Sequence, residues 1–181
     1  MVVAKSRRQM KGQLYRLAVA RNDFYHAAEA CQTILRMRLS FDDPLYFPLQ
    51  EGVVIAYSRP FSGGQIGTLP AKYSKFENPR HRSHHKELLE LRNTLVAHSD
   101  AQVKRVLIYP PGSTFGPMTV SKVGIQVIGK VFEPVFFEMV ESLCATQLVR
   151  LNEHIQELLD SLYPSGSMGE TRFFLDDSED H

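Results

Sequence analysis

Four side chains that could take part in catalysis or bind a phosphate stand close together in one helical stretch of the sequence. They are Arg92, Asn93, His98 and Ser99. Histidine titrates near neutral pH and can accept or donate a proton. The planar guanidinium of arginine matches phosphate oxygens and stabilises developing negative charge. Asn93 could position the histidine or hold a phosphate oxygen, and Ser99 could also hold one. The set suits metal-free cleavage of RNA, which supplies its own nucleophile in the 2′-hydroxyl.

The arginine of this set stands where a plain core helix would carry an apolar residue. At about 100° per residue, four apolar side chains form a continuous arc, and Arg92 falls inside it. The four are Leu88, Leu91, Leu95 and Val96. A guanidinium in such an arc needs a carboxylate, backbone carbonyls, a subunit partner or an anionic ligand.

A purely structural role is the alternative for the arginine and the histidine. Arg92 could pair with a carboxylate such as Glu29 or Glu141. His98 could cap the carboxyl end of its helix, where a cation is favoured by up to about 1 kcal/mol. Arg92 paired to an intrachain glutamate and remote from any cleft would favour this structural interpretation.

Length and charge bound the kind of protein. The 181 residues, 43% of them hydrophobic, suffice for one well-filled core, so we expect a single domain over residues 1–164. The formal net charge is +1, with 21 basic and 20 acidic side chains. No overall field would hold such a protein on nucleic acid or anionic lipid, and a polyanion site must be a local patch.

Cysteine usage and the lack of long apolar runs predict a cytoplasmic protein. Cys31 and Cys144 lie far apart in helical patterns, which gives neither a disulfide framework nor a metal-ligand spacing. We therefore expect two reduced thiols in the core. No apolar segment follows the basic residues near the N-terminus, and no run of about 18 apolar residues occurs. A secreted or membrane-spanning protein is not expected.

Apolar residues that recur at spacings of three and four predict four main helices. These helices cover residues 7–39, 45–57, 83–99 and 133–162. Asp43 suits the N-cap of the second helix, and Pro44 its first position. β-Branched, partly alternating segments at 103–109 and 118–128 predict short strands in a hairpin.

These elements predict a mainly α fold. We expect a four-to-five-helix up-and-down bundle with a small inserted β-hairpin over residues 103–129. Residues 165–181 combine Gly and Ser with several acids and are expected to form a mobile acidic tail.

Residues 61–82 show no sustained period and contain several Gly and Pro residues, which predicts a long loop. The second half of this loop and the start of the next helix are basic, with Tyr73 and Phe76 interleaved. The candidate phosphate contacts are Lys72, Lys75, Arg80, Arg82, His85 and Lys86. A solvated loop that is merely basic is the open alternative.

Three histidines close to the start of the motif helix raise the question of a metal site. His81, His84 and His85 have no Cys or carboxylate at a matching spacing. We therefore expect no metal and no other cofactor.

The motif helix resembles a known family signature. Residues 91–98, with the sequence Leu-Arg-Asn-Thr-Leu-Val-Ala-His, are similar to the motif of the HEPN superfamily. In that motif an arginine, often followed by a polar residue, precedes a histidine by four to six intervening residues near the end of one helix. Residues 97–100 and the corner at residues 57–61 resemble the branch associated with abortive phage infection.

The resemblance implies a homodimer in which two motif helices face each other. Two copies of Arg92 and His98 would then share one composite cleft. Such proteins commonly act as metal-independent endoribonucleases in toxin, antiphage or stress systems, sometimes beside a cognate antitoxin. Other members have lost activity and bind a protein or a nucleotide. The hairpin insert is a departure from the minimal bundle.

Three interpretations follow from the sequence. The first is a HEPN-type ribonuclease with His98 as general acid or base, Arg92 as clamp and Asn93 in support. The second is a catalytically inactive HEPN dimer that serves as a protein- or nucleotide-binding module. The third is a helical scaffold in which the motif occurs by coincidence.

Overall fold

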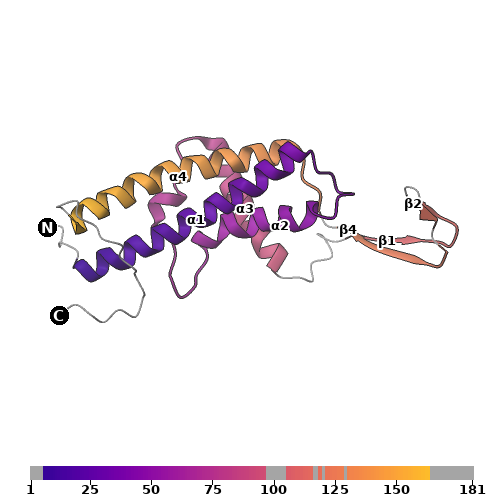
Figure 1. Ribbon diagram of the computed structural model, residues 1–181, viewed down its shortest axis with the longest axis horizontal. Coiled ribbons are helices and arrows are strands. Elements are labelled where there is room, and N and C mark those ends of the chain that lie inside the picture. Colours follow the sequence, from indigo (N-terminus) through magenta and orange to yellow (C-terminus); the bar gives the residue numbers. More distant parts are fainter. Residues whose placement is uncertain (1–5, 97–104, 116–117, 120, 129, 164–181) are drawn as a thin grey trace.

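The protein is mainly helical, with a β-hairpin arm (Figure 1). The computed structural model describes residues 6–96, 105–115, 118–119, 121–128 and 130–163. Helices α1 (Arg7–Met37) and α4 (Pro134–Leu162) run side by side in opposite directions, and α2 (Tyr46–Ser58) packs on α1. Helix α3 (Pro79–Val96) lies against α2 and α4. The predicted helical bundle with a hairpin insert is confirmed.

Helix α1 owes its start and its packing to local sequence. Ser6 accepts a hydrogen bond from the Gln9 backbone N–H at 3.2 Å, and the Ser6 N–H donates to Gln9 Oε1 at 2.9 Å. This capping box satisfies two backbone donors at the helix start. The buried face of α1 carries apolar residues at spacings of three and four, and one acid, Asp23, stands among them.

Helix α2 begins later than the sequence suggested. The Asp43 carboxylate accepts from the Ser40 N–H at 3.0 Å, and the Asp43 carbonyl accepts from the Tyr46 N–H at 3.1 Å. The side chain of Asp43 thus closes a turn before the helix instead of capping it, and Leu45 takes the N-cap position. The predicted N-cap was wrong because Asp side chains also stabilise such local turns.

Helix α3 begins four residues earlier than predicted, at Pro79. Asn78 Oδ1 accepts a hydrogen bond from the Arg80 N–H at 2.9 Å, and the Asn78 carbonyl accepts from the Arg82 N–H at 3.1 Å. Asn before Pro is a favourable helix start, because Asn caps the free N–H groups and Pro suits the first position. A short 3₁₀ turn, η1 (Arg59–Phe61), leads into the predicted loop, and a second one, η2 (Ala71–Ser74), interrupts it.

The arm between α3 and α4 contains two nested antiparallel pairs. Strand β1 (Arg105–Tyr109) pairs with β4 (Gly124–Ile128), and β2 (Thr114–Phe115) pairs with β3 (Met118–Thr119). The hairpin prediction is confirmed, although the second predicted strand divides into β3 and β4. In Figure 1 the arm extends beyond one end of the helices.

The helices enclose one apolar core, to which α1, α2 and α4 contribute most. Cys31 on α1 and Cys144 on α4 are both fully buried and free, as predicted. Burial raises the pKa of the Cys31 thiol to about 12 and raises that of Cys144 as well. No helix of the described residues is both long and apolar enough to cross a membrane. The predicted acidic tail lies outside the described residues.

Candidate functional site

Three arginines line one hollow beside the corner that follows α2. They come from α1, from the η1 turn and from α3, and they are Arg16, Arg59 and Arg92. The hollow, which we call the arginine pocket, has a volume of about 410 Å³. One acid, Asp23, and the glycine-rich loop formed by residues 62–67 complete its polar side. The apolar side is lined by Val19, Ala20, Ile55, Pro60 and Leu69.

Arg92 reaches this pocket from the last described turns of α3. Its side chain is half-buried, and one terminal nitrogen donates to Asn93 Oδ1 at 3.2 Å. No carboxylate in the described part of the chain lies within ion-pair distance of this guanidinium. Glu141, a possible partner in the structural interpretation, instead accepts a hydrogen bond from Gln32 at 2.7 Å. Arg92 therefore lines a cleft, and no glutamate of the described residues lies within ion-pair distance of it.

Asp23 and Arg59 form the ion pair of the pocket. Arg59 Nη1 lies 2.6 Å from Asp23 Oδ1, and Asp23 is only 3% exposed. Burial raises the pKa of the Asp23 carboxyl, while the nearby Arg59 guanidinium acts in the opposite direction. The pair thus holds the corner after α2 against the middle of α1.

Arg16 connects α1 to the glycine-rich loop. Its Nε donates to the Ile66 carbonyl at 3.0 Å. Gly67 has a φ of +79°, and a side chain there would meet the Arg16 guanidinium at 3.6 Å. The Leu69 N–H donates to the Pro60 carbonyl at 2.8 Å, which closes the base of the loop. Glycine suits position 67 because its left-handed backbone disfavours other residues.

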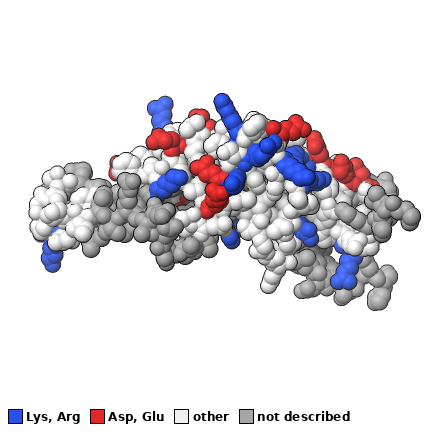
Figure 2. Space-filling view, turned by 180° about the vertical axis from the view of Figure 1, so that it is seen from behind, with Lys and Arg blue, Asp and Glu red and all other residues white. Residues whose placement is uncertain are grey.

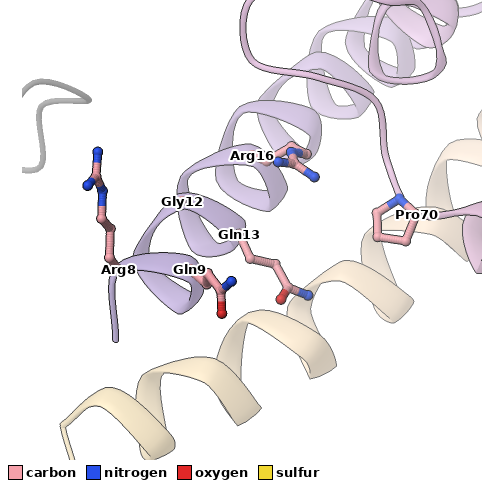
Figure 3. A pocket seen from close by; sticks show the side chains of 6 residues that line it. All are labelled: Arg8, Gln9, Gly12, Gln13, Arg16 and Pro70. Atoms are coloured by element: carbon pink, nitrogen blue, oxygen red, sulfur yellow. The ribbon is translucent and has the colours of Figure 1, made fainter. Parts of the chain in front are cut away.

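A second hollow of about 570 Å³ adjoins Arg16 along the first turns of α1 (Figure 3). In this view Gln13 extends from α1 towards α4, and Arg16 faces the segment that leads to Pro70. Gln13 Nε2 lies 2.9 Å from a ring nitrogen of His154, whose other ring nitrogen is 2.8 Å from the Tyr73 hydroxyl. This second hollow is thus bordered by a network that fixes α1, α4 and η2 together.

Aromatic side chains and His85 pack together beneath the corner that follows α2. Phe61 packs edge-on against His85 with ring centroids 4.6 Å apart, and His85 Nδ1 lies 3.0 Å from the Tyr57 hydroxyl. His85 is 5% exposed, and burial lowers its pKa. The prediction that His85 contacts phosphate on the surface does not fit this position. The prediction overlooked that His85 lies three residues before the buried Leu88 on the same helix and therefore shares its inward face.

The other predicted phosphate contacts lie on the surface. Lys72, Lys75, Arg80, Arg82 and Lys86 are exposed. Two of them also have structural partners. Arg82 donates to the Phe76 carbonyl at 2.9 Å, and Lys86 lies 3.7 Å from Glu90. On the face drawn in Figure 2, basic and acidic side chains are interspersed over the helical body. The structure does not place any of these five residues in the lining of the arginine pocket.

The second half of the predicted catalytic set lies outside the described residues. This applies to His98 and Ser99, whereas Arg92 and Asn93 are described and adjacent. That His98 shares a site with Arg92 therefore stays a prediction.

The three clustered histidines have separate partners. His81 Nε2 lies 3.2 Å from Ser142 Oγ, His84 Nδ1 lies 3.2 Å from a Glu87 oxygen, and His85 contacts Tyr57. Among the described side chains, no group of three or more His, Cys, Asp or Glu residues could hold a metal ion.

Sequence reasoning missed three residues of the pocket. Asp23 could have been found, because it occupies the apolar stripe of α1 between Ala20 and Ala27, just as Arg92 interrupts the stripe of α3. Arg59 and Arg16 carry no such signal. Their role depends on how the corner and the loop fold back onto α1, which no local pattern specifies.

No protein-family model, no curated protein and no solved structure matches this chain. Membership of the HEPN superfamily, which the motif helix suggested, therefore stays a prediction. The case for function depends on the geometry of the pocket.

Proposed function

We propose that this chain is a metal-independent endoribonuclease of the HEPN type, acting in the cytoplasm as a homodimer. In this proposal Arg92 stabilises charge on the scissile phosphate and Asn93 supports it. One observation carries the proposal: Arg92 is a half-buried residue that lines a cleft with two further arginines, and no carboxylate of the described part of the chain lies within ion-pair distance of its guanidinium. A phosphate oxygen is the partner that such a planar donor is suited to bind.

The reaction would use the nucleophile that RNA already contains. The 2′-hydroxyl oxygen attacks the neighbouring phosphorus, the bond from phosphorus to the 5′-oxygen breaks, and a cyclic phosphate and a 5′-hydroxyl result. His98 takes the 2′ proton as general base, and the leaving 5′-oxygen receives a proton from the resulting imidazolium or from water. Arg92 offsets the charge that develops on the non-bridging oxygens.

The biological setting that fits this activity is a toxin or an antiphage effector of the abortive-infection kind, controlled by an antitoxin protein. A catalytically inactive HEPN dimer that binds a nucleotide or a protein is the second candidate. One observation favours it: Arg16 and Arg59 also line the arginine pocket, so that an anion would find cationic partners there without His98.

The decisive experiment is cleavage of single-stranded RNA by the purified protein in EDTA. We expect cutting by the native chain, loss of cutting in Arg92→Ala and His98→Ala, and no change in Arg36→Ala, an exposed arginine on α1 outside the pocket. Thermal melting of each variant checks that the fold is intact. Equal cutting by all four proteins would contradict the proposal. A dimer that never cuts RNA would leave the binding module as the better description.

A further inference from the structure

We propose that the arginine pocket binds a nucleoside phosphate, with Arg16 and Ile55 as binding residues outside the Arg92 and His98 motif. The phosphate would lie on the arginine side and the nucleoside against the apolar side. The nucleotide could be a unit of an RNA chain, in which case the inference rests on the proposed function, or it could be a free mononucleotide.

The charge balance of the pocket favours an anion. Asp23 compensates Arg59, since their side chains are 2.6 Å apart. Arg16 and Arg92 have no carboxylate within ion-pair distance among the described residues. Two guanidinium groups therefore line a hollow that contains one already paired acid, and a phosphate would offset their charge.

Hydrogen-bond donors remain available on the same side. Arg16 uses Nε for the Ile66 carbonyl, and its two terminal nitrogens make no hydrogen bond to a described residue. In the adjoining loop, the backbone N–H groups of residues 63–66 donate to no carbonyl of the described chain. Figure 3 shows Arg16 on the side of α1 that faces the chain leading from this loop to Pro70. Backbone N–H groups beside a guanidinium form a suitable cradle for phosphate oxygens.

The size and the apolar side of the pocket favour more than an inorganic ion. Its volume of about 410 Å³ falls within the range of small-molecule sites, roughly 300–1,000 Å³. Ile55 on α2 is 39% exposed and lines the hollow together with Val19 and Pro60. An exposed isoleucine beside two arginines that have no carboxylate partner among the described residues makes an amphipathic site. A nucleotide has a matching combination of a base with flat faces that stack on apolar groups and a charged phosphate.

Two substitutions test the pocket, each with a matched control. Ile55→Glu places a carboxylate at an exposed position of the pocket wall, and Val149→Glu makes the same change at a 57% exposed position on α4 outside it. Arg16→Gln removes a pocket guanidinium. Arg36→Gln removes one elsewhere on α1 that likewise bonds a backbone carbonyl, that of Gln32 at 3.3 Å. Because residue 55 is exposed, Ile55→Glu should fold even if Arg16→Gln loosens the loop.

The probes separate the possible ligands. Calorimetric titrations would use 5′-AMP, adenosine, inorganic phosphate and a 2′-O-methyl dinucleotide, which cannot be cut because it lacks the 2′-hydroxyl. We expect 5′-AMP or the dinucleotide to bind, and adenosine and phosphate to bind about tenfold more weakly or worse. Arg16→Gln should weaken binding by about tenfold or more, as expected for a lost charge-assisted contact. Ile55→Glu should weaken it to a similar degree, because the new carboxylate repels the phosphate and replaces apolar surface. Both control variants should bind like the native protein.

The outcomes distinguish this inference from the proposed function. Tighter binding of the dinucleotide identifies a site for RNA, and tighter binding of 5′-AMP identifies a site for a free nucleotide. If nucleotide binding depends on residues 16 and 55 but the protein does not cut RNA, the proposed nucleotide site is supported. The proposed ribonuclease activity is then contradicted. If the native protein cuts RNA but Ile55→Glu and Val149→Glu bind the nucleotide probes equally well, the proposed nucleotide site is overturned. The proposed ribonuclease activity would then be unaffected. If inorganic phosphate binds as tightly as 5′-AMP and the dinucleotide, the claim that the apolar side of the pocket contacts the nucleoside is also overturned.

Discussion

Two charged residues that interrupt apolar stripes meet at one pocket. Arg92 interrupts the stripe of α3, and Asp23 interrupts that of α1. A charge on a packing face is costly unless it is paired or binds a ligand. Asp23 is paired with Arg59, whereas Arg92 has no described carboxylate beside it. The unpaired member is therefore the one to which we assign the ligand.

The Asp23 and Arg59 pair gives a prediction about stability. Arg59→Met would leave a buried carboxylate without its partner, at a cost of about 2 kcal/mol at neutral pH. This is less than for a fully buried pair, because the Arg59 side chain is 59% exposed. Without Arg59, which lowers the pKa of Asp23, burial raises that pKa further. Urea unfolding at several pH values measures the effect.

The sign of the pH dependence follows from that raised pKa. A carboxyl group whose folded pKa exceeds its unfolded value favours folding below the unfolded pKa, and this contribution is lost as pH rises through the folded pKa. The loss in Arg59→Met should therefore be larger at pH 8 than at pH 5. The double variant Asp23→Asn with Arg59→Met should recover stability at pH 8. A pH-independent loss would contradict this account of the pair.

The buried histidine His85 gives a second prediction. Burial lowers its pKa, so below about pH 6.5 the unfolded chain binds a proton that the folded chain does not. The free energy of unfolding should fall as pH drops from 7 to 5, by at most about 1.4 kcal/mol per pH unit from this residue. The double variant His85→Phe with Tyr57→Phe removes both hydrogen-bond partners and should flatten the slope. His84→Gln, on the same helix but only half-buried, should keep it.

At the scale of elements, the start and the phase of α3 decide where the basic residues lie. The helix begins at Pro79, which brings Arg80 into it, and its phase leaves Arg80 and Lys86 exposed while His85 shares the buried face with Leu88. Lys75 lies just before it, at the end of the η2 turn. These exposed cations are the candidates for contact with the flanking phosphates of an RNA substrate, away from the arginine pocket.

The salt dependence of RNA binding tests these cations. The double variant Lys75→Ala with Arg80→Ala should weaken binding of single-stranded RNA and reduce the slope of log K against log salt by about 0.7 per lost phosphate contact. Arg36→Ala with Lys122→Ala removes the same charge from α1 and the arm, and should leave the slope unchanged. Equal slopes in both double variants would show that Lys75 and Arg80 are ordinary solvated surface.

Elements with a strong apolar period could be predicted from the sequence, and elements set by tertiary contact could not. The bounds of α1 and α4 match the expected ranges within two residues, because each has a long stripe and a clear start. The capping role predicted for Asp43 was wrong and that of Asn78 was missed, because both depend on competing local hydrogen bonds. Arg92 was recognisable because it breaks a stripe, but its neighbours Arg16 and Arg59 come together only when the glycine-rich loop folds onto α1.

For the whole molecule, a formal net charge near zero agrees with local contacts to an anion and not with a strong overall field. The net charge is +1, and Figure 2 shows basic and acidic side chains interspersed on the face it presents. Because the net charge is close to zero, long-range attraction to RNA should be weak, and specificity would depend on contacts within the arginine pocket. The proposed dimer matters for the same reason, since a second subunit would double the number of arginines near one phosphate.

Complementation between inactive variants tests that dimer. If the cleft is shared, a dimer of one Arg92→Ala chain and one His98→Ala chain still holds one intact arginine and one intact histidine. Mixing the two inactive proteins under conditions that exchange subunits should therefore restore part of the RNA cutting, while either protein alone stays inactive. Size-exclusion chromatography with light scattering checks that mixed dimers form. Because a site built within one chain would need both residues from the same subunit, mixed dimers without any cutting would contradict the shared cleft.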